Sequence, residues 1–167
     1  DARLGEENLD LKKTKIEIVQ INLGKMCNLT CAHCHVEAGP DRTEIMTTNS
    51  LSQLVKLAEK LGVHTVDLTG GAPEMSPHFK EYVREFRKLG CKVIVRSNLT
   101  ILVEKGYEDF VDFFKEQELY VVASLPCYTS DNVDAQRGDG VFDDSIDALQ
   151  RLNKAGYGKE GTGLYLS

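Results

Sequence analysis

Short apolar runs alternate with longer stretches of helical periodicity along most of the chain. Runs rich in Ile, Val and Leu, which are typical of buried strands, occupy residues 16–23, 64–68, 92–97, 120–124 and 163–167. Between them, apolar residues recur every three or four positions, as in helices that bury one face, in residues 48–61, 77–89, 108–118 and 143–155. The pattern therefore predicts five strands that alternate with four helices.

Turn and cap residues mark the ends of these elements. Thr48 or Asn49 is the expected N-cap of the first helix, and Ser76-Pro77 is expected to open the second. Gly62 follows the first helix at the position where a left-handed residue ends a helix. Residues 128–141 show no apolar periodicity, and we expect a long loop there that carries Arg137.

Strands separated by helices indicate βαβ crossovers and a parallel sheet, which is an α/β fold. Five strands are fewer than the eight of a closed barrel, so the pattern fits an incomplete (β/α) barrel or a doubly wound sheet. In both folds, ligands bind at the carboxyl ends of the strands. Residues that follow each strand are therefore the candidates for function.

Composition excludes several classes of protein. The chain has 167 residues, enough for one domain, with 41% hydrophobic residues and a formal net charge of −6. This negative charge argues against a nucleic-acid partner. No apolar run approaches the roughly 18 residues of a membrane span. We expect a polar N-terminal segment over residues 1–14, followed by a single core unit over residues 15–167.

Three cysteines stand together directly after the first strand. Cys27, Cys31 and Cys34 are separated by three and two residues in the run CNLTCAHCHV. Thiolates are soft ligands, and three of them on one loop can hold a [4Fe–4S] cluster and leave one iron open for chemistry. The chain has five cysteines, and the clustered ones are too close together to staple a secreted fold. A reducing, intracellular compartment, the cytoplasm, is therefore expected.

The same run allows other interpretations. A structural zinc site with His33 or His35 as fourth ligand is one, although such sites usually draw on two separated cysteine pairs. Residues 31–35 also fit the C-x-x-C-H attachment motif of c-type haem, and Cys31 with Cys34 fits a redox pair. A non-enzymatic metal-binding domain is thus the alternative to an enzyme.

The C-x3-C-x2-C loop after the first strand resembles that of the radical S-adenosylmethionine (radical SAM) enzymes. Five blocks resemble the arsenosugar-biosynthesis members of that family, namely CNLTCAHCHVEAGPDRTE, LTGGAPEMSPHF, VRSNLTIL, SLPCY and NVDAQRGDGVFDDSIDALQRLN. The resemblance implies a partial (β/α) barrel with a [4Fe–4S] cluster and S-adenosylmethionine (SAM). It also implies a 5′-deoxyadenosyl radical that is joined to a methylated trivalent arsenical. A flavodoxin or ferredoxin would be the electron donor and a small molecule the substrate.

The resemblance assigns roles to residues at the ends of the first two strands. Cys27, Cys31 and Cys34 would be the cluster ligands, and His33 takes a position where the family has an aromatic residue near the adenine. The family has G-G-E-P after the second strand, where the backbone binds the amino group of SAM. This chain has Gly70, Gly71, Ala72 and Pro73 there, with Glu74 next. Ala72 replaces the family's glutamate, so a carboxylate contact would fall to Glu74.

The last candidates follow the third and fourth strands. Short polar groups that could face SAM are Ser97, Asn98 and Ser124. Arg137 is expected to pair with the SAM carboxylate, or else to be a solvated turn residue with Asp134 as its partner. Cys127 is predicted as a catalytic or substrate-binding thiol, because arsenic is thiophilic, or as a buried small residue.

Overall fold

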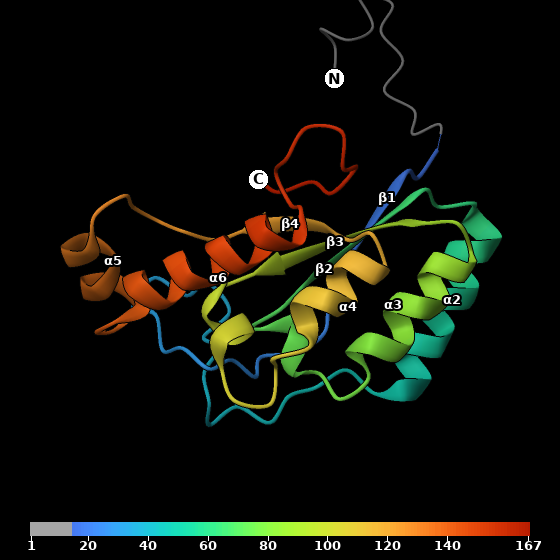
Figure 1. Cartoon of the computed structure of the whole chain (residues 1–167). Helices are drawn as coiled ribbons and strands as arrows, with labels where there is room; N and C mark the ends of the chain where they lie inside the picture. Colours follow the sequence, from blue (N-terminus) through green and yellow to red (C-terminus); the bar gives the residue numbers. More distant parts are fainter. Residues whose placement is uncertain (1–14) are drawn as a thin grey trace, which may run out of the picture.

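The computed structural model describes residues 15–167, so the predicted segment 1–14 lies outside the described residues. Four parallel strands form one sheet in the order in which they occur in the chain (Figure 1). They are β1 (Ile18–Asn22), β2 (Thr65–Thr69), β3 (Lys92–Ser97) and β4 (Tyr120–Ala123). A barrel adds each strand beside the previous one, whereas a doubly wound sheet reverses its order. The partial barrel is therefore confirmed, and the doubly wound alternative is wrong.

The last residues of the chain begin a fifth strand. Val121 donates its backbone N–H to the Tyr165 carbonyl at 3.0 Å, and Ala123 donates to the Ser167 carbonyl at 2.7 Å. Leu166 forms a parallel bridge with Val121. The Tyr165 ring stacks on that of Tyr120 with centroids 5.5 Å apart. The predicted fifth run is thus present as a parallel bridge beside β4.

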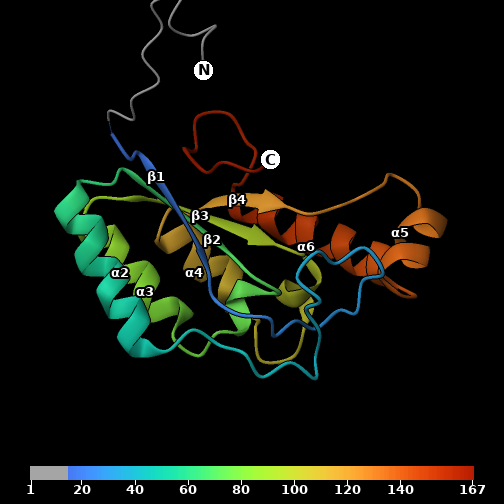
Figure 2. The same ribbon diagram turned by 180° about the vertical axis from the view of Figure 1, so that it is seen from behind.

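Helices cover one face of the sheet. They are α2 (Thr48–Leu61), α3 (Phe79–Lys88), α4 (Phe110–Glu116) and α6 (Val141–Ala155). Alternate strand residues face this layer, and their side chains are fully buried, as at Val66, Val93 and Val121. Figure 2 looks onto the other face, with α4 and α6 behind the sheet. None of the described helices has the length and apolar character needed to cross a membrane.

Three predictions of local structure were wrong. Residues 128–141 contain a further helix, α5 (Ser130–Arg137), in which Val133 is the one buried apolar residue, so the sequence carries little periodicity there. The first helix is capped by Thr47, whose side chain accepts from the Ser50 N–H, one residue before the expected cap. Ser76 does not cap α3, which begins three residues later.

Two 3-10 helices were not predicted. They are η1 (Pro73–Met75) and η2 (Thr100–Val103), and each follows the carboxyl end of a strand. Both are too short for a repeating apolar pattern to reveal them. They matter because η1 contains Glu74 and η2 begins two residues after Asn98.

Candidate metal centre and cofactor site

The cysteine loop is held at both of its ends by backbone hydrogen bonds. Met46 donates to the Leu23 carbonyl at 2.8 Å, and Lys25 donates to the Glu44 carbonyl at 2.9 Å. Further along, the Cys27 N–H reaches the Gly39 carbonyl at 3.1 Å. The loop therefore extends the sheet edge beyond β1 and places its cysteines at the carboxyl ends of the strands.

The three cysteines of the loop are free thiols that differ in burial. Cys27 is buried, whereas Cys31 and Cys34 are partly exposed. Burial raises the pKa of the Cys27 thiol, and the Leu29 N–H and the Asn98 amide oppose this effect. The Cys34 sulfur accepts a hydrogen bond from the Ala38 N–H at 3.2 Å. Both hydrogen-bonded sulfurs thus have donors that favour the thiolate form.

Within residues 15–167, no three Cys, His, Asp or Glu side chains converge on a position for one metal ion. A [4Fe–4S] cube does not require such convergence, because each cysteine binds a different iron. A single zinc ion does require it.

Arg137, the last residue of α5, brings a positive charge to the cysteines. Its guanidinium donates to the carbonyl and the hydroxyl oxygen of Ser124, both at 2.6 Å. Burial lowers the pKa of Arg137, and the thiols of Cys31 and Cys27 oppose this effect. Arg137 is 6% exposed, and among the described residues its Nε has no hydrogen-bond partner.

The position of Arg137 is fixed by the loop and by its own helix. The Ala32 N–H donates to the Gln136 carbonyl at 3.1 Å, which ties α5 to the cysteine loop (Figure 2). Asp134, the alternative partner, instead accepts from the backbone of Gly140 at 3.1 Å and of Phe142 at 2.9 Å. Arg137 is therefore aimed at the cysteines and Ser124.

The paired glycines after β2 pack directly on the start of the cysteine loop. The Gly71 N–H donates to the Gly24 carbonyl at 3.0 Å, and the Ala72 N–H donates to the Met26 carbonyl at 2.9 Å. A Cβ on Gly71 would lie 2.4 Å from the Met26 carbonyl oxygen. Only glycine fits this approach. Ala72 and Pro73 are buried behind the turn.

Glu74 is a buried carboxylate in η1. It is 2% exposed, and neither of its oxygens has a hydrogen-bond partner by distance and angle among the described residues. Burial raises its pKa from 4.5 to about 7, against smaller opposing effects of its own backbone N–H and the nearby Ser97 hydroxyl. Its negative charge is close enough to raise the pKa of Cys27.

Replacement of Glu74 by Gln is expected to stabilise the cluster-free chain in a pH-dependent way. The folded state binds the Glu74 proton more tightly than the unfolded state, so wild-type stability falls as the pH rises from 4.5 to about 7. The E74Q variant has no carboxylate at this position, so its stability does not fall for this reason as the pH rises. We expect a gain of about 1 kcal/mol at pH 5 and about 3 kcal/mol at pH 8 in urea unfolding.

The exposed Glu116→Gln makes the same chemical change at the end of α4 and is the matched control. A gain for E74Q that is equal at the two pH values, or a loss at pH 8, would contradict the buried-carboxylate interpretation.

The remaining predicted site residues lie around this edge in different environments. Ser97 and Asn98 are buried, with 0% and 9% exposure. His33 and His35 are exposed on the loop. Cys127 is partly exposed, and hydrogen bonds from the backbone and hydroxyl of Thr129 lower its pKa, so it is not the buried small residue of the alternative view. Cys91 lies in the core, and its Sγ donates to the Val63 carbonyl.

A polar row on the helix-free face of the sheet was missed by sequence reasoning. The Arg96 guanidinium donates to the Asp67 carboxylate at 2.8 to 3.1 Å, and the Gln20 amide donates to it at 3.0 Å. Alternation along three strands could have revealed it, since Asp67 interrupts an apolar run. This row runs across β1, β2 and β3.

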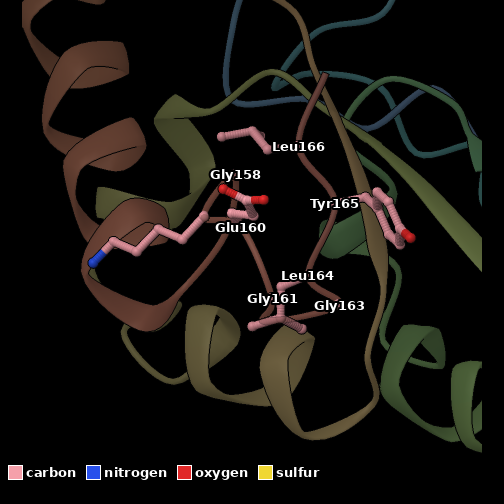
Figure 3. Close-up of a pocket in the computed structure, with 8 residues that line it drawn as sticks. Gly158, Glu160, Gly161, Gly163, Leu164, Tyr165 and Leu166 are labelled. Atoms are coloured by element: carbon pink, nitrogen blue, oxygen red, sulfur yellow. The ribbon is translucent and has the colours of Figure 1, made fainter.

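A hollow of about 300 Å³ lies within the C-terminal loop, lined by residues such as Gly158, Glu160 and Tyr165 (Figure 3). This loop lies at the opposite end of the sheet from the cysteine loop in both overall views. Much of its lining is glycine backbone, and it contains none of the predicted site residues. We therefore do not include it in the site.

Together, these features fit the expected cofactors. Three thiols on one loop, a buried guanidinium with an unpaired N–H, and a glycine turn that accepts no side chain converge at the carboxyl ends of β1, β2 and β4. They define a (β/α)-barrel protein with three thiols grouped at the carboxyl ends of its strands.

Comparison with known families identifies this class. Residues 21–166 match the radical SAM superfamily, and the chain belongs to it. The superfamily uses a [4Fe–4S] cluster and SAM, so both cofactors predicted from the sequence are supported. The arsenosugar resemblance has no counterpart among the relatives that follow.

Curated relatives whose names do not refer to arsenosugar biosynthesis match most of the chain. A probable GTP 3′,8-cyclase of Pyrococcus horikoshii is 29% identical over 142 residues, which is 83% of this chain and 44% of that protein. The mycofactocin maturase MftC of Mycobacterium tuberculosis is 31% identical over 136 residues, or 78% of this chain and 33% of that protein. The chain thus spans less than half the length of these relatives.

Solved structures agree on the fold. Streptococcus suis SuiB bound to S-adenosylmethionine has a TM-score of 0.69 at 20% identity, covering 93% of this chain and 35% of that one. The structure of anSMEcpe with bound AdoMet has a TM-score of 0.70 at 19% identity, covering 92% and 42%.

Proposed function

We propose that residues 15–167 form the cluster- and SAM-binding core of a radical SAM enzyme, with Cys27, Cys31 and Cys34 as the cluster ligands. The observation that carries the proposal is that the thiols of Cys31 and Cys27, on the loop that also holds Cys34, lie near the buried Arg137 guanidinium. When bound, the cluster supplies one electron to SAM, which yields methionine and a 5′-deoxyadenosyl radical. The chain itself holds the cofactors and excludes water around them.

In this proposal, different residues around the cysteines bind different groups of SAM. The backbone of Gly70, Gly71, Ala72 and Pro73 approaches its amino group, and Glu74 adds negative charge behind that turn. Arg137, oriented by Ser124, takes its carboxylate. Ser97 and Asn98 are further candidates, and His33 lies at the exposed rim for the adenine. A planar guanidinium suits a carboxylate because it offers parallel N–H donors.

Replacement of Arg137 by Gln is expected to weaken SAM binding by about tenfold to about a hundredfold, the effect of losing one charge-assisted hydrogen bond. The measurement is a titration of the reconstituted protein with SAM, followed by the electron paramagnetic resonance (EPR) signal of the reduced cluster. The control is Arg42→Gln, which removes a partly exposed arginine paired with Glu44. Equal affinity in wild type and R137Q would exclude Arg137 from the SAM site.

We further propose a methylated trivalent arsenical as the acceptor of the adenosyl group, on the five sequence blocks described above. The partly exposed Cys127, with its lowered pKa, supplies a thiolate for the thiophilic arsenic. A soluble electron donor such as a flavodoxin or ferredoxin and a cytoplasmic setting complete this proposal. Because the chain spans less than half of its relatives, the activity of the whole protein is part of the proposal.

The test is a product analysis under anaerobic conditions. The reconstituted, reduced chain is incubated with SAM and a methylated trivalent arsenical, and products are identified by mass spectrometry. We expect a product that contains both arsenic and the adenosyl group, and its loss in Cys127→Ser. GTP replaces the arsenical in a parallel reaction, because relatives carry the name GTP 3′,8-cyclase. A product from GTP, with none from the arsenical, would overturn the choice of acceptor.

A further inference from the structure

The segment after β3 reaches across the sheet edge to the most buried cysteine. The Asn98 side-chain nitrogen lies 3.5 Å from the Cys27 sulfur and 2.7 Å from the Asn28 side-chain oxygen. Cys27 is 6% exposed and Asn98 is 9% exposed. This contact therefore lies in the protein interior, where an N–H donor has a strong effect on a neighbouring charge.

The orientation of the Asn98 amide follows from its surroundings. Its side-chain oxygen accepts the Ile101 backbone N–H at 3.1 Å and faces the Thr100 hydroxyl at 3.4 Å. A flipped amide would direct its NH2 group at the Ile101 N–H, donor against donor. The NH2 group must therefore point to Cys27 and Asn28.

The backbone holds this arrangement at a cost. Leu99 has a φ of 71°, which non-glycine residues rarely adopt, and its side chain is fully buried. Such strain persists only where the surroundings fix it, and it concentrates at functional sites. Asn28 also donates to the Thr100 hydroxyl at 2.8 Å, so the cysteine loop and η2 are joined around Asn98.

Among the described residues, the three thiols differ in what stabilises their negative charge. Cys34 has the backbone N–H of Ala38, at 3.2 Å from its sulfur. Burial raises the pKa of the Cys31 thiol, and the positive charge of Arg137 nearby opposes this effect. Cys27 has the neutral amide of Asn98. Of these groups, only the Asn98 amide is a side-chain donor that can be removed without changing the net charge.

We propose that Asn98 is a positioning residue that donates to the Cys27 thiolate and raises the reduction potential of the cluster. The inference rests on the cluster site of the proposed function. Reduction adds one negative charge to the cluster, and hydrogen bonds to its sulfurs favour the reduced form. Asn98 thereby makes the electron easier to place on the cluster before it passes to SAM.

The test is a potentiometric titration of the reconstituted chain without SAM, followed by the EPR signal of the reduced cluster. We expect Asn98→Leu to shift the midpoint potential to a more negative value, by more than the spread of replicate wild-type titrations. Thr100→Val breaks the neighbouring contacts of the same segment but keeps the Asn98 donor, so it should leave the potential unchanged. An unchanged potential in N98L, or an equal shift in T100V, would overturn the proposal.

A second variant tests the proposal if the N98L variant does not bind a cluster. Asn98→Asp keeps an oxygen for the Ile101 N–H and removes the donor, and it should also shift the potential to a more negative value. If neither variant takes up iron while T100V does, Asn98 serves assembly and the tuning role is wrong. Failure of the wild type to take up a cluster would instead contradict the proposed function itself.

Discussion

Replacement of Cys27, Cys31 or Cys34 by Ala is expected to abolish stable cluster binding in each single variant. Reconstituted wild-type chain should hold about four iron and four sulfide per chain, as a [4Fe–4S] cluster requires, and each variant close to none. The reason is that, in the proposed site, these three thiolates would be the protein ligands of the cluster, and one iron would be left for SAM. Iron and sulfide analysis with absorption spectra checks the result.

Cys91 provides the matched control for this series. Its thiol is buried at the start of β3 and donates to the Val63 carbonyl. This position is away from the carboxyl ends of the strands, where the proposed ligands lie. Cys91→Ala should therefore retain the cluster. Full iron content in any of the three loop variants would exclude that cysteine as a ligand.

Replacement of Gly71 by Ala should disrupt both the fold and the site. The new Cβ would lie 2.4 Å from the Met26 carbonyl oxygen and 2.9 Å from the Cys27 Cβ, and the first of these is backbone that has little room to move. We expect a loss of about 3 kcal/mol in the free energy of unfolding, the upper end for overpacking a tight site. The displaced Cys27 should also lower the iron content.

The control for this steric effect is Gly39→Ala, on the same loop. The nearest atoms to a Cβ there are side-chain carbons of Thr30 and Arg42, at 3.7 and 4.0 Å, which is ordinary contact. Urea unfolding of the two variants measures the difference. Equal stability of G71A and G39A would show that the glycine turn does not pack on the cysteine loop as described.

Much of the fold was predictable because the strands and long helices repeat an apolar pattern. The runs at residues 64–68 and 92–97 match β2 and β3 closely, since each is buried on the helix side. Helix α5 escaped prediction because Val133 alone anchors it in the core. The choice between barrel and doubly wound sheet depended on strand order, which is a tertiary property that local periodicity does not encode.

The site was predictable where spacing along the chain is informative. The three cysteines lie on one loop, so their spacing alone pointed to a shared centre. The contact of Asn98 with Cys27 joins residues that are 71 positions apart in the sequence. It also depends on the positive φ of Leu99, which cannot be predicted from the presence of a leucine. Likewise, Arg137 was a loop candidate, and its burial against Ser124 depends on the unpredicted helix α5.

The central claim is that the three-thiolate loop holds a [4Fe–4S] cluster with one iron open to SAM. The most direct measurement is EPR of the anaerobically reconstituted, reduced chain, recorded with and without SAM. We expect a [4Fe–4S]⁺ signal whose g values shift when SAM is added. A protein that takes up zinc in place of iron, or a cluster signal that SAM leaves unchanged, would contradict it.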